Sequence, residues 1–237
     1  MAVFQLTGRI SFPPPQFADK SGLLAVGGDL SMERVLLAYK MGIFPWYDNS
    51  TPILWWSPDP RMVLYPANFH MPKSLKKSLK KKKFTVTMDE DFESVIYNCA
   101  YSRLCKGEET WITEEMKESY IRLHDSGYAH SVEVWQDGVL SGGLYGVSIG
   151  RVFFGESMFS LVSDASKTGF SYLVRQLENW NFILIDCQVA TDNLSRFGAV
   201  EIPRDRFLSD IKFGFSKGTT LRNRWHFDKN LEVITNG

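Results

Sequence analysis

The chain has 237 residues, 44% of them hydrophobic and 14% aromatic, which suffices for one large core or two smaller ones and excludes a disordered composition. Lys plus Arg and Asp plus Glu both number 27, so affinity for a polyanion must come from a local cluster of charge. Three cysteines without CxxC spacing (Cys99, Cys105, Cys187) argue against a disulfide framework or a zinc site, and indicate a reducing compartment.

Targeting signals are not evident in the sequence. Pro13-Pro14-Pro15 stands where a signal peptide needs an apolar core. No run approaches the roughly 18 apolar residues of a membrane span. We therefore expect a cytoplasmic protein without a membrane contact.

Residues 1–61 are rich in Pro, Gly and Trp and predict a small N-terminal domain. A helix is expected over 31–41, with Ser31 as its N-cap and Gly42 as its stop. Three tryptophans and two prolines then form a rigid apolar wall (Trp46, Trp55, Trp56). Such a wall is either a small core or a surface on which a nucleobase stacks, and the sequence leaves both open.

A second domain over 62–237 is expected to begin with a strand at 61–65 and a lysine-rich helix. Four lysines recur at i, i+3, i+4 and i+7 and so share one helical face (Lys73, Lys76, Lys77, Lys80). Such a face is either merely solvated or, in a chain of zero net charge, a contact for a phosphate backbone.

Alternating strands and helices follow the lysines. A strand over 84–88 precedes two helices with Asp89 and Thr113 as N-caps, separated by a polar loop at 106–110. Residues 130–159 then read as three strands of an antiparallel meander joined by tight glycine turns.

After the meander we expect a helix capped by Ser163 or Asp164, a strand over 182–189, and loops beyond Phe207. This order is an α+β plan with a mixed, mainly antiparallel sheet, and it resembles the second half of the N-acetyltransferase (GNAT) fold. That superfamily binds a pyrophosphate with a glycine-rich loop before a helix. Residues 160–167 contain no glycine, which argues against coenzyme A as the acyl donor.

Polar side chains interrupt two apolar strands of this plan, at Glu156 and at Asp186 with Gln188. Residues two apart on a strand share a face, so we expect Glu156, Met158 and Ser160 to point one way, and Asp186 and Gln188 likewise. A buried carboxylate costs several kcal/mol unless it is paired. The two strands therefore predict a site that holds an amine.

The same parity turns Cys187 away from this site and into the core, which argues against a cysteine nucleophile. The four histidines show neither metal-ligand nor triad spacing, so no metal is expected.

Several motifs, in order and rich in Trp, resemble the leucyl/phenylalanyl-tRNA–protein transferase family. The resemblance extends from about Phe12 to Arg204 and rests on Gly27-Gly28-Asp29-Leu30, Gly42-Ile43-Phe44-Pro45-Trp46, Trp55-Trp56-Ser57-Pro58-Asp59-Pro60-Arg61, Thr110-Trp111-Ile112-Thr113, Gly155-Glu156-Ser157-Met158-Phe159-Ser160 and Ile185-Asp186-Cys187-Gln188.

The resemblance implies a small N-terminal domain plus a GNAT-like domain. It implies transfer of Leu or Phe, with Met as a further candidate, from aminoacyl-tRNA to the α-amine of proteins that begin with Arg or Lys. Such a transfer marks proteins for N-end-rule degradation. No cofactor is implied, and a monomer is expected.

Roles are carried over residue by residue. Asp186 and Gln188 match the catalytic pair, and Glu156 matches the acidic residue beside them. The remaining matches are the aromatics of the aminoacyl-adenosine site (Trp46, Trp111), the wall of the amino-acid pocket (Leu144, Phe153, Met158, to which strand parity adds Ser160), and the basic cluster for the tRNA acceptor stem (Lys73, Lys77, Lys80, Lys81).

Three details qualify this match. Strand parity places Phe153 on the face opposite Met158. Asn193 stands where the family often has His, and Leu144 stands where Met is more usual. The first substitution affects a secondary polar contact, and the second changes the shape of the pocket only modestly.

The chemistry follows from the donor, because an aminoacyl ester is already activated and needs no acyl-enzyme. Our hypothesis is direct aminolysis, in which Gln188 accepts a hydrogen bond from the amine while Asp186 fixes its NH2 end. Glu156 holds the cationic residue of the acceptor or orients its amine. The alternative is that the terminal hydroxyl of the tRNA shuttles the proton. The rival functions are a tRNA-binding module without catalysis and a coenzyme A-dependent acetyltransferase.

Overall fold

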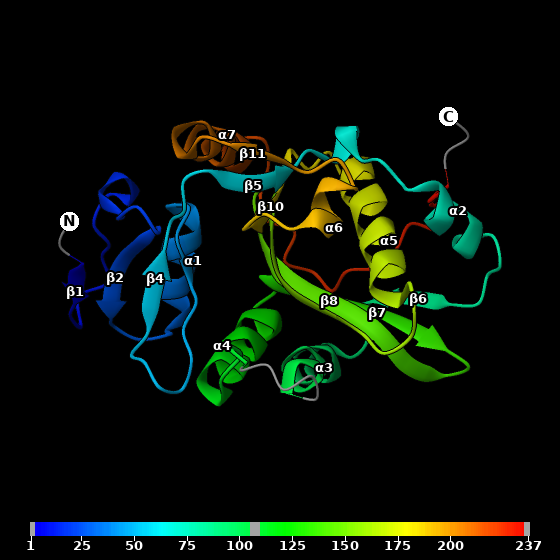
Figure 1. Ribbon diagram of the computed structural model, residues 1–237, viewed down its shortest axis with the longest axis horizontal. Coiled ribbons are helices and arrows are strands. Elements are labelled where there is room, and N and C mark those ends of the chain that lie inside the picture. The colour runs from blue at the N-terminus through cyan, green and yellow to red at the C-terminus, as the bar shows by residue number, and fades with distance from the viewer. Residues whose placement is uncertain (1–2, 105–109, 235–237) are drawn as a thin grey trace.

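The computed structural model describes residues 3–104 and 110–234, which form two β-sheets with helices packed around them (Figure 1). Cys105 and most of the predicted loop at 106–110 lie outside the described residues. Within the described ranges, every helix is too short or too polar to cross a membrane.

The smaller sheet is built from the N-terminal part of the chain. It has four strands in the order β1-β2-β4-β3, and the helix α1 packs beside it. The bounds of these elements are β1 Phe4–Leu6, β2 Leu23–Gly27, α1 Met32–Lys40, β3 Phe44–Pro45 and β4 Leu54–Trp56, with a 3-10 turn at Pro15–Phe17. The helix predicted over 31–41 is thus confirmed.

The tryptophan wall divides between core and surface. Trp55 is fully buried and donates from Nε1 to the carbonyl of Gly27 at 2.9 Å. Trp56 donates to the carbonyl of Trp46 at 2.7 Å, while the Trp46 ring is 46% exposed. Trp55 therefore belongs to the core, whereas the ring of Trp46 is left accessible on the surface.

The larger sheet has seven strands in the order β11-β5-β10-β9-β8-β7-β6. Among these described neighbours only the β10–β9 pair is parallel, so the sheet is mixed and mainly antiparallel, as predicted. The bounds are β5 Arg61–Leu64, β6 Thr85–Met88, β7 Ala129–Gln136, β8 Val139–Ile149, β9 Val152–Ser160, β10 Leu184–Gln188 and β11 Val200–Ile202. Asp137 and Gly138, both at positive φ, form the tight turn between β7 and β8.

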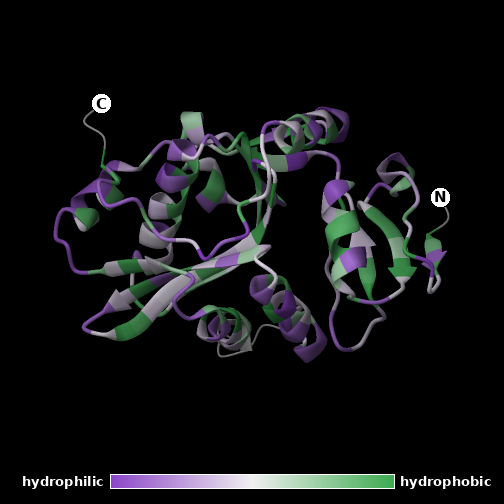
Figure 2. Cartoon of the chain, turned by 180° about the vertical axis from the view of Figure 1, so that it is seen from behind, coloured by the Kyte–Doolittle hydropathy of each residue, from purple (hydrophilic) through white to green (hydrophobic). Residues whose placement is uncertain are grey.

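Helices cover both faces of this sheet (Figure 1). α3 (Phe92–Leu104) and α4 (Glu114–Asp125) lie on one face, and α5 (Ala165–Asn179) lies on the other with α2 (Lys73–Leu79) beside it. Figure 2 shows hydrophobic residues on the strands and hydrophilic residues on the loops and outer helix turns. Thr113 caps α4 as predicted, because its hydroxyl accepts from the backbone N of Met116 at 3.2 Å.

Two core clusters result, one on each face. The first runs from the N-terminal sheet through α1 and α4 to β8 and β9, and includes Tyr39, Trp55, Tyr120 and Phe154. The second lies under α5 and includes Leu144 and Phe153. The first cluster is continuous across both sheets, so burial of apolar surface joins them.

The prediction of loops beyond Phe207 is wrong, because Arg204–Ser216 forms the helix α7 beside β5 and β10. Phe207 and Ile211, four residues apart, bury one side of this helix. Charged residues on both sides concealed this short apolar spacing, since Arg206 precedes Phe207 and Lys212 follows Ile211. A smaller helix, α6 (Asp192–Ser195), lies between β10 and β11 in the chain.

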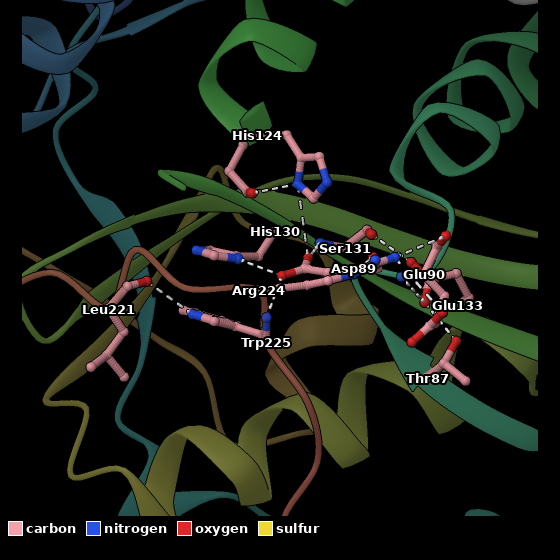
Figure 3. A network of polar contacts seen from close by, with 11 residues as sticks. Thr87, Asp89, Glu90, His124, His130, Ser131, Glu133, Leu221, Arg224 and Trp225 are labelled. Carbon is pink, nitrogen blue, oxygen red and sulfur yellow. Dashed lines mark hydrogen bonds and ion pairs between the residues drawn. The ribbon is translucent and has the colours of Figure 1, made fainter. Parts of the chain in front are cut away.

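The prediction that Asp89 caps α3 is wrong. Its backbone has φ of 55° and its buried carboxylate accepts from His130 Nδ1 at 2.8 Å, Ser131 N at 2.9 Å and Trp225 N at 2.7 Å (Figure 3). Burial lowers the pKa of His130, which favours the neutral ring. This carboxylate ties the C-terminal segment to the sheet, because buried acceptors need several donors.

The tied segment supports the second core cluster. Trp225 stacks on His130 with ring centroids 3.7 Å apart, and its ring lies 6.0 Å from that of Phe153. Arg224 donates to the carbonyl of Asp89 at 2.6 Å. Phe153 lines the cavity described next, so the C-terminal segment backs one wall of that cavity.

Candidate active site

A cavity of about 490 Å³ opens between the two sheets. β9 and β10 pair only as far as Phe154 and Asp186, after which β9 runs on to Ser160 while β10 ends at Gln188. The strands separate beyond this last pair, and the residues just past it, 155–158 on β9 and 187–188 on β10, line the cavity together with Trp46, which follows β3. The opening is therefore made by the end of a parallel strand pair.

A β-bulge lies on each of the two separating strands. Against β8, both Ser157 and Gly155 have partners and Glu156 is the extra residue; against β5, Cys187 is the extra residue between Asp186 and Gln188. Bulges re-aim side chains and break the alternation of a strand. The polar residues singled out by sequence therefore stand at irregularities on both strands.

The bulge on β9 overturns two predictions of strand parity. Phe153 is opposite Ser148 and Met158 is opposite Leu144, so Phe153 and Met158 lie on one face and not on opposite faces. Glu156 does not share that face, since its carboxylate contacts the first core cluster. The inserted residue shifts the alternation of β9 by one, so side chains beyond it lie on the faces opposite to those predicted.

Asp186 is fully buried and is held by Arg61. The guanidinium donates from Nε to Oδ1 at 2.8 Å and from Nη2 to Oδ2 at 2.6 Å. The guanidinium lies 4.6 Å from the ring centroids of both Phe44 and Phe207. Such a bidentate pair between rings satisfies a desolvated carboxylate.

Sequence reasoning gave no role to Arg61. The available signal was the carboxylate itself, because a buried Asp on an apolar strand requires a cation and Arg61 opens the apolar strand β5.

Glu156 and Gln188 are joined directly. Gln188 Nε2 donates to Glu156 Oε1 at 2.8 Å, while the backbone N of Gln188 donates to Asp186 Oδ1 at 2.9 Å. The predicted fixing of the Gln188 NH2 end by Asp186 is thus wrong: Glu156 fixes that end, and Asp186 fixes the backbone. The bulge at Cys187, together with φ of 61° at Gln188, turns the amide toward β9.

The carboxyl group of Glu156 also forms hydrogen bonds with two tyrosine hydroxyls that come from helices outside the sheet. Tyr39 of α1 lies 2.8 Å from Oε1 and Tyr120 of α4 lies 2.9 Å from Oε2. Burial, only partly offset by these hydrogen bonds, raises the pKa of Glu156 to about 8. Neither tyrosine was singled out by sequence, because each comes from a helix whose spacing fits an ordinary core.

The residues that line the cavity form a buried apolar side and a second group that includes two tryptophans. Leu144, Phe153, Phe170 and Leu173 make its buried apolar side, and Met158 is 41% exposed at its edge. Trp46 and Trp111 also line the cavity, as does the exposed Asn193.

Two predicted residues differ in their surroundings from expectation. Ser160 is not among the residues that line the cavity; its hydroxyl donates to the carbonyl of Val162 at 2.8 Å and accepts from the backbone N of Ser166. Cys187 borders both the cavity and the second core cluster. Burial raises the pKa of the Cys187 thiol far above its usual value, so the thiolate is disfavoured as a nucleophile.

The predicted lysines lie on an exposed surface. Lys73, Lys77, Lys80 and Lys81 are exposed on and just after α2, which is anchored by the buried Leu75. Lys83 donates to the carbonyl of Ser163 at 3.2 Å, in the loop before α5. The described residues contain no group of three or more His, Cys, Asp or Glu placed to hold a metal ion.

Comparisons with known proteins agree with one another. A family model described as leucyl/phenylalanyl-tRNA protein transferase matches residues 63–212, and one described as the N-terminal domain of that protein matches residues 28–59. The leucyl/phenylalanyl-tRNA–protein transferase of Desulfatibacillum aliphaticivorans is 55% identical over 228 residues, which cover 96% of this chain and 97% of that protein. Its counterpart from Saccharophagus degradans is 59% identical over 198 residues, which cover 83% of this chain and 81% of that protein.

A solved structure is similar only remotely. The structure of L-PGS from Bacillus licheniformis matches with a TM-score of 0.41 and 8% identity, over 71% of this chain and 53% of that one. That level of similarity carries no argument about the site.

Proposed function

Because the chain belongs to the leucyl/phenylalanyl-tRNA protein transferase family, we propose that the cavity between its sheets is the site where the aminoacyl ester of the tRNA meets the acceptor amine. The protein is an aminoacyltransferase that moves an amino acid from tRNA to the N-terminus of a protein. The observation that carries the assignment of the site is the Gln188 amide, held by Glu156 and by the Arg61–Asp186 pair where the sheet opens.

The donor fits the cavity in two parts. The buried apolar side of Leu144, Phe153, Phe170 and Leu173 suits the side chain of Leu or Phe. Trp46 and Trp111 offer aromatic faces for the terminal adenosine, since base stacking contributes about 1–3 kcal/mol per base. The proposed donor is therefore Leu-tRNA or Phe-tRNA, with Met-tRNA as a further candidate.

The transfer is a direct aminolysis. The nitrogen of the acceptor forms a bond to the ester carbonyl carbon, the bond from that carbon to the tRNA oxygen breaks, and the proton lost by the amine ends on that oxygen. With its NH2 end donated to Glu156, Gln188 presents Oε1 as an acceptor for an N–H of the attacking amine. Holding amine and ester together supplies several kcal/mol of the barrier.

We assign residues 1–61 to an N-terminal domain and residues 62–237 to a GNAT-like domain. The division is supported by the two sheets, because the strands of the smaller one end at Trp56 and those of the larger one begin at Arg61. Arg61 therefore stands at the joint, with its side chain between Phe44 of the first part and Phe207 of the second.

The exposed lysines are assigned to the tRNA acceptor stem. Replacing Lys73, Lys77, Lys80 and Lys81 by Ala is expected to raise KM for aminoacyl-tRNA while kcat changes little. The slope of log affinity against log salt should become shallower by about 0.9 for each phosphate that the variant no longer neutralises. Replacing the exposed Lys40 and Lys212, on α1 and α7, is the control and should leave the salt slope unchanged. An unchanged slope in the α2 variant would remove these lysines from the tRNA interface.

The apolar side of the cavity is expected to select the amino acid. Leu144→Phe adds volume there and should raise the ratio of kcat/KM for Leu-tRNA over Phe-tRNA roughly tenfold, because small volume changes in such pockets contribute about 1–3 kcal/mol. Val139→Phe makes a comparable addition on the same strand, at a residue 66% exposed, and should not change the ratio. An equal loss for both donors would argue against this wall as the amino-acid pocket.

One assay tests the function as a whole. The protein is mixed with radiolabelled Leu-tRNA and a peptide beginning with Arg, and label is followed on the peptide. We expect transfer to peptides beginning with Arg or Lys and none to a peptide beginning with Glu. Deacylation of the tRNA without labelled peptide would refute the transfer, and binding without either would indicate a tRNA-binding module.

A further inference from the structure

Three oxygen-bearing groups meet behind Gln188 and form a closed triangle. Tyr39 Oη and Tyr120 Oη lie 2.5 Å apart, Tyr39 Oη lies 2.8 Å from Glu156 Oε1, and Tyr120 Oη lies 2.9 Å from Glu156 Oε2. All three side chains are buried. Oxygen atoms at these separations repel one another unless a proton lies between them.

Counting protons decides the state of the triangle. The two phenol hydroxyls supply one proton each, so an ionised Glu156 leaves two protons for three contacts. A protonated Glu156 supplies the third proton, and every contact is then a hydrogen bond. Tyrosinate is no alternative, because burial raises the pKa of both tyrosines well above the usual value for the phenol.

One placement of the third proton suits Gln188 best, because a carbonyl oxygen is a better acceptor than the hydroxyl oxygen of an acid. With the proton on Oε2, Glu156 donates to Tyr120, Tyr120 donates to Tyr39, and Tyr39 donates to Oε1. Oε1 is then a carbonyl oxygen with two lone pairs, one for Tyr39 and one for the Nε2 of Gln188 at 2.8 Å. The closed ring of hydrogen bonds therefore ends in the amide that faces the cavity.

The charged groups around the triangle leave this count unchanged. Asp186 on β10 disfavours a second negative charge at Glu156, and Arg61 on β5 favours it, but these two are already paired with each other. From β8, the ring of Tyr145 packs edge-on against Tyr120 with centroids 5.6 Å apart. The pKa of Glu156, raised to about 8 mainly by burial, agrees with a neutral acid at physiological pH.

We propose that Glu156, buried beside the short contact between the two tyrosine hydroxyls, is protonated at neutral pH, and that Tyr39 and Tyr120 are positioning residues of the transfer reaction, which close its ring of hydrogen bonds and so hold the Gln188 amide with its carbonyl toward the acceptor amine. The proposal rests on the function given above. Loss of the third proton breaks one edge of the triangle and adds a negative charge behind Gln188, so the active state is the protonated one. Because α1 and α4 each supply one tyrosine, the site is complete only when both helices are in place.

The pH dependence of single-turnover transfer is the first test. In the wild type, the rate should fall as pH rises through about 8, the pKa of Glu156. Glu156→Ala should lower the rate at pH 7 about 100-fold, and Glu156→Gln should recover about tenfold of that loss, because its NH2 group supplies the third proton at every pH. Glu156→Gln should also lack the fall above pH 8. A fall of the same size in Glu156→Gln would overturn the proposal.

The tyrosines have their own variants and a matched control. Tyr39→Phe and Tyr120→Phe should each lower kcat more than they raise KM, and should shift the alkaline limb of the pH profile. Tyr65→Phe removes a hydroxyl that donates to the carboxylate of Asp210 at 2.6 Å, away from the cavity, and should leave the limb in place. A limb unmoved by both tyrosine variants would show that they act only in packing.

Two readouts do not depend on transfer, so they separate this proposal from the proposed function. In protein with 13C-labelled Glu, infrared spectra at pH 7 should show the C=O stretch of one protonated carboxyl group. That band should vanish above about pH 8 and be absent from Glu156→Gln. A missing band at pH 7 would overturn the proton count.

Unfolding is the second such readout. The native state keeps a proton that the unfolded chain releases, so the unfolding equilibrium constant should rise up to tenfold per pH unit between about pH 5 and pH 8, relative to Glu156→Gln. Stability from this group is thus present at low pH and lost as pH rises. Parallel pH profiles for the two proteins would contradict the proposal.

Discussion

Replacing Arg61 by Met is expected to destabilise the protein by about 3–5 kcal/mol and to abolish transfer. Asp186 is fully buried and both of its carboxylate oxygens receive the guanidinium. Removing the cation leaves the buried carboxylate without a partner. An unpaired buried charge destabilises the folded state more than loss of the whole ion pair does. The measurement is urea unfolding at pH 7, with the midpoint and the slope both followed.

A second substitution separates stability from function. In Arg61→Met/Asp186→Leu both charges are gone, so most of the stability should return, as it does when buried ion pairs are replaced by apolar residues. Activity should stay lost, because nothing then accepts from the backbone N of Gln188 at 2.9 Å. If Arg61→Met alone costs less than about 1 kcal/mol, the carboxylate must be reached by water and the pair is not a structural support of the site.

The sequence identified the polar residues of the site but not the hydrogen bonds between them. Glu156, Asp186 and Gln188 were evident as polar residues on apolar strands, and the resemblance supplied their roles. Their contacts were predicted wrongly because strand parity assumes an unbroken alternation, and each strand carries a bulge at this level. A bulge has no clear mark in a sequence when its residues are ordinary for a strand.

The sequence also did not predict the contacts that residues of other helices and strands make with the site. Arg61, Tyr39 and Tyr120 reach the site from β5, α1 and α4, and their spacing within those elements reveals only which face is buried. The mixed sheet and the meander followed from local alternation and turn residues, whereas α7 was missed because charged residues interrupt its apolar spacing. Local patterns thus predict elements better than they predict contacts between elements.

Gln188→Ala is expected to lower the single-turnover rate by about 10²–10³-fold while KM for aminoacyl-tRNA changes little. Gln188 makes its contribution through Oε1, which Ala lacks, and the loss should therefore appear in the chemical step. Ala and Gln both carry a Cβ at φ of 61°, so the backbone strain is the same in the two proteins and stability should change little. Gln188→Glu places a second carboxyl within 2.8 Å of Glu156, so the pair must share a proton and its rate should become more pH-dependent.

Proton transfer through the tRNA hydroxyl predicts the opposite pattern of rates. If the terminal hydroxyl of the tRNA shuttles the proton, a donor lacking the 2′-hydroxyl should react slowly and the Gln188 variants should react almost normally. If Gln188 accepts from the amine, the deoxy donor should keep most of its rate and Gln188→Ala should lose it. Unchanged rates in both Gln188→Ala and Gln188→Glu would exclude the amide. Because Glu156 holds the side chain of Gln188 and Asp186 holds its backbone, that result would also leave both hydrogen bonds with a purely structural role.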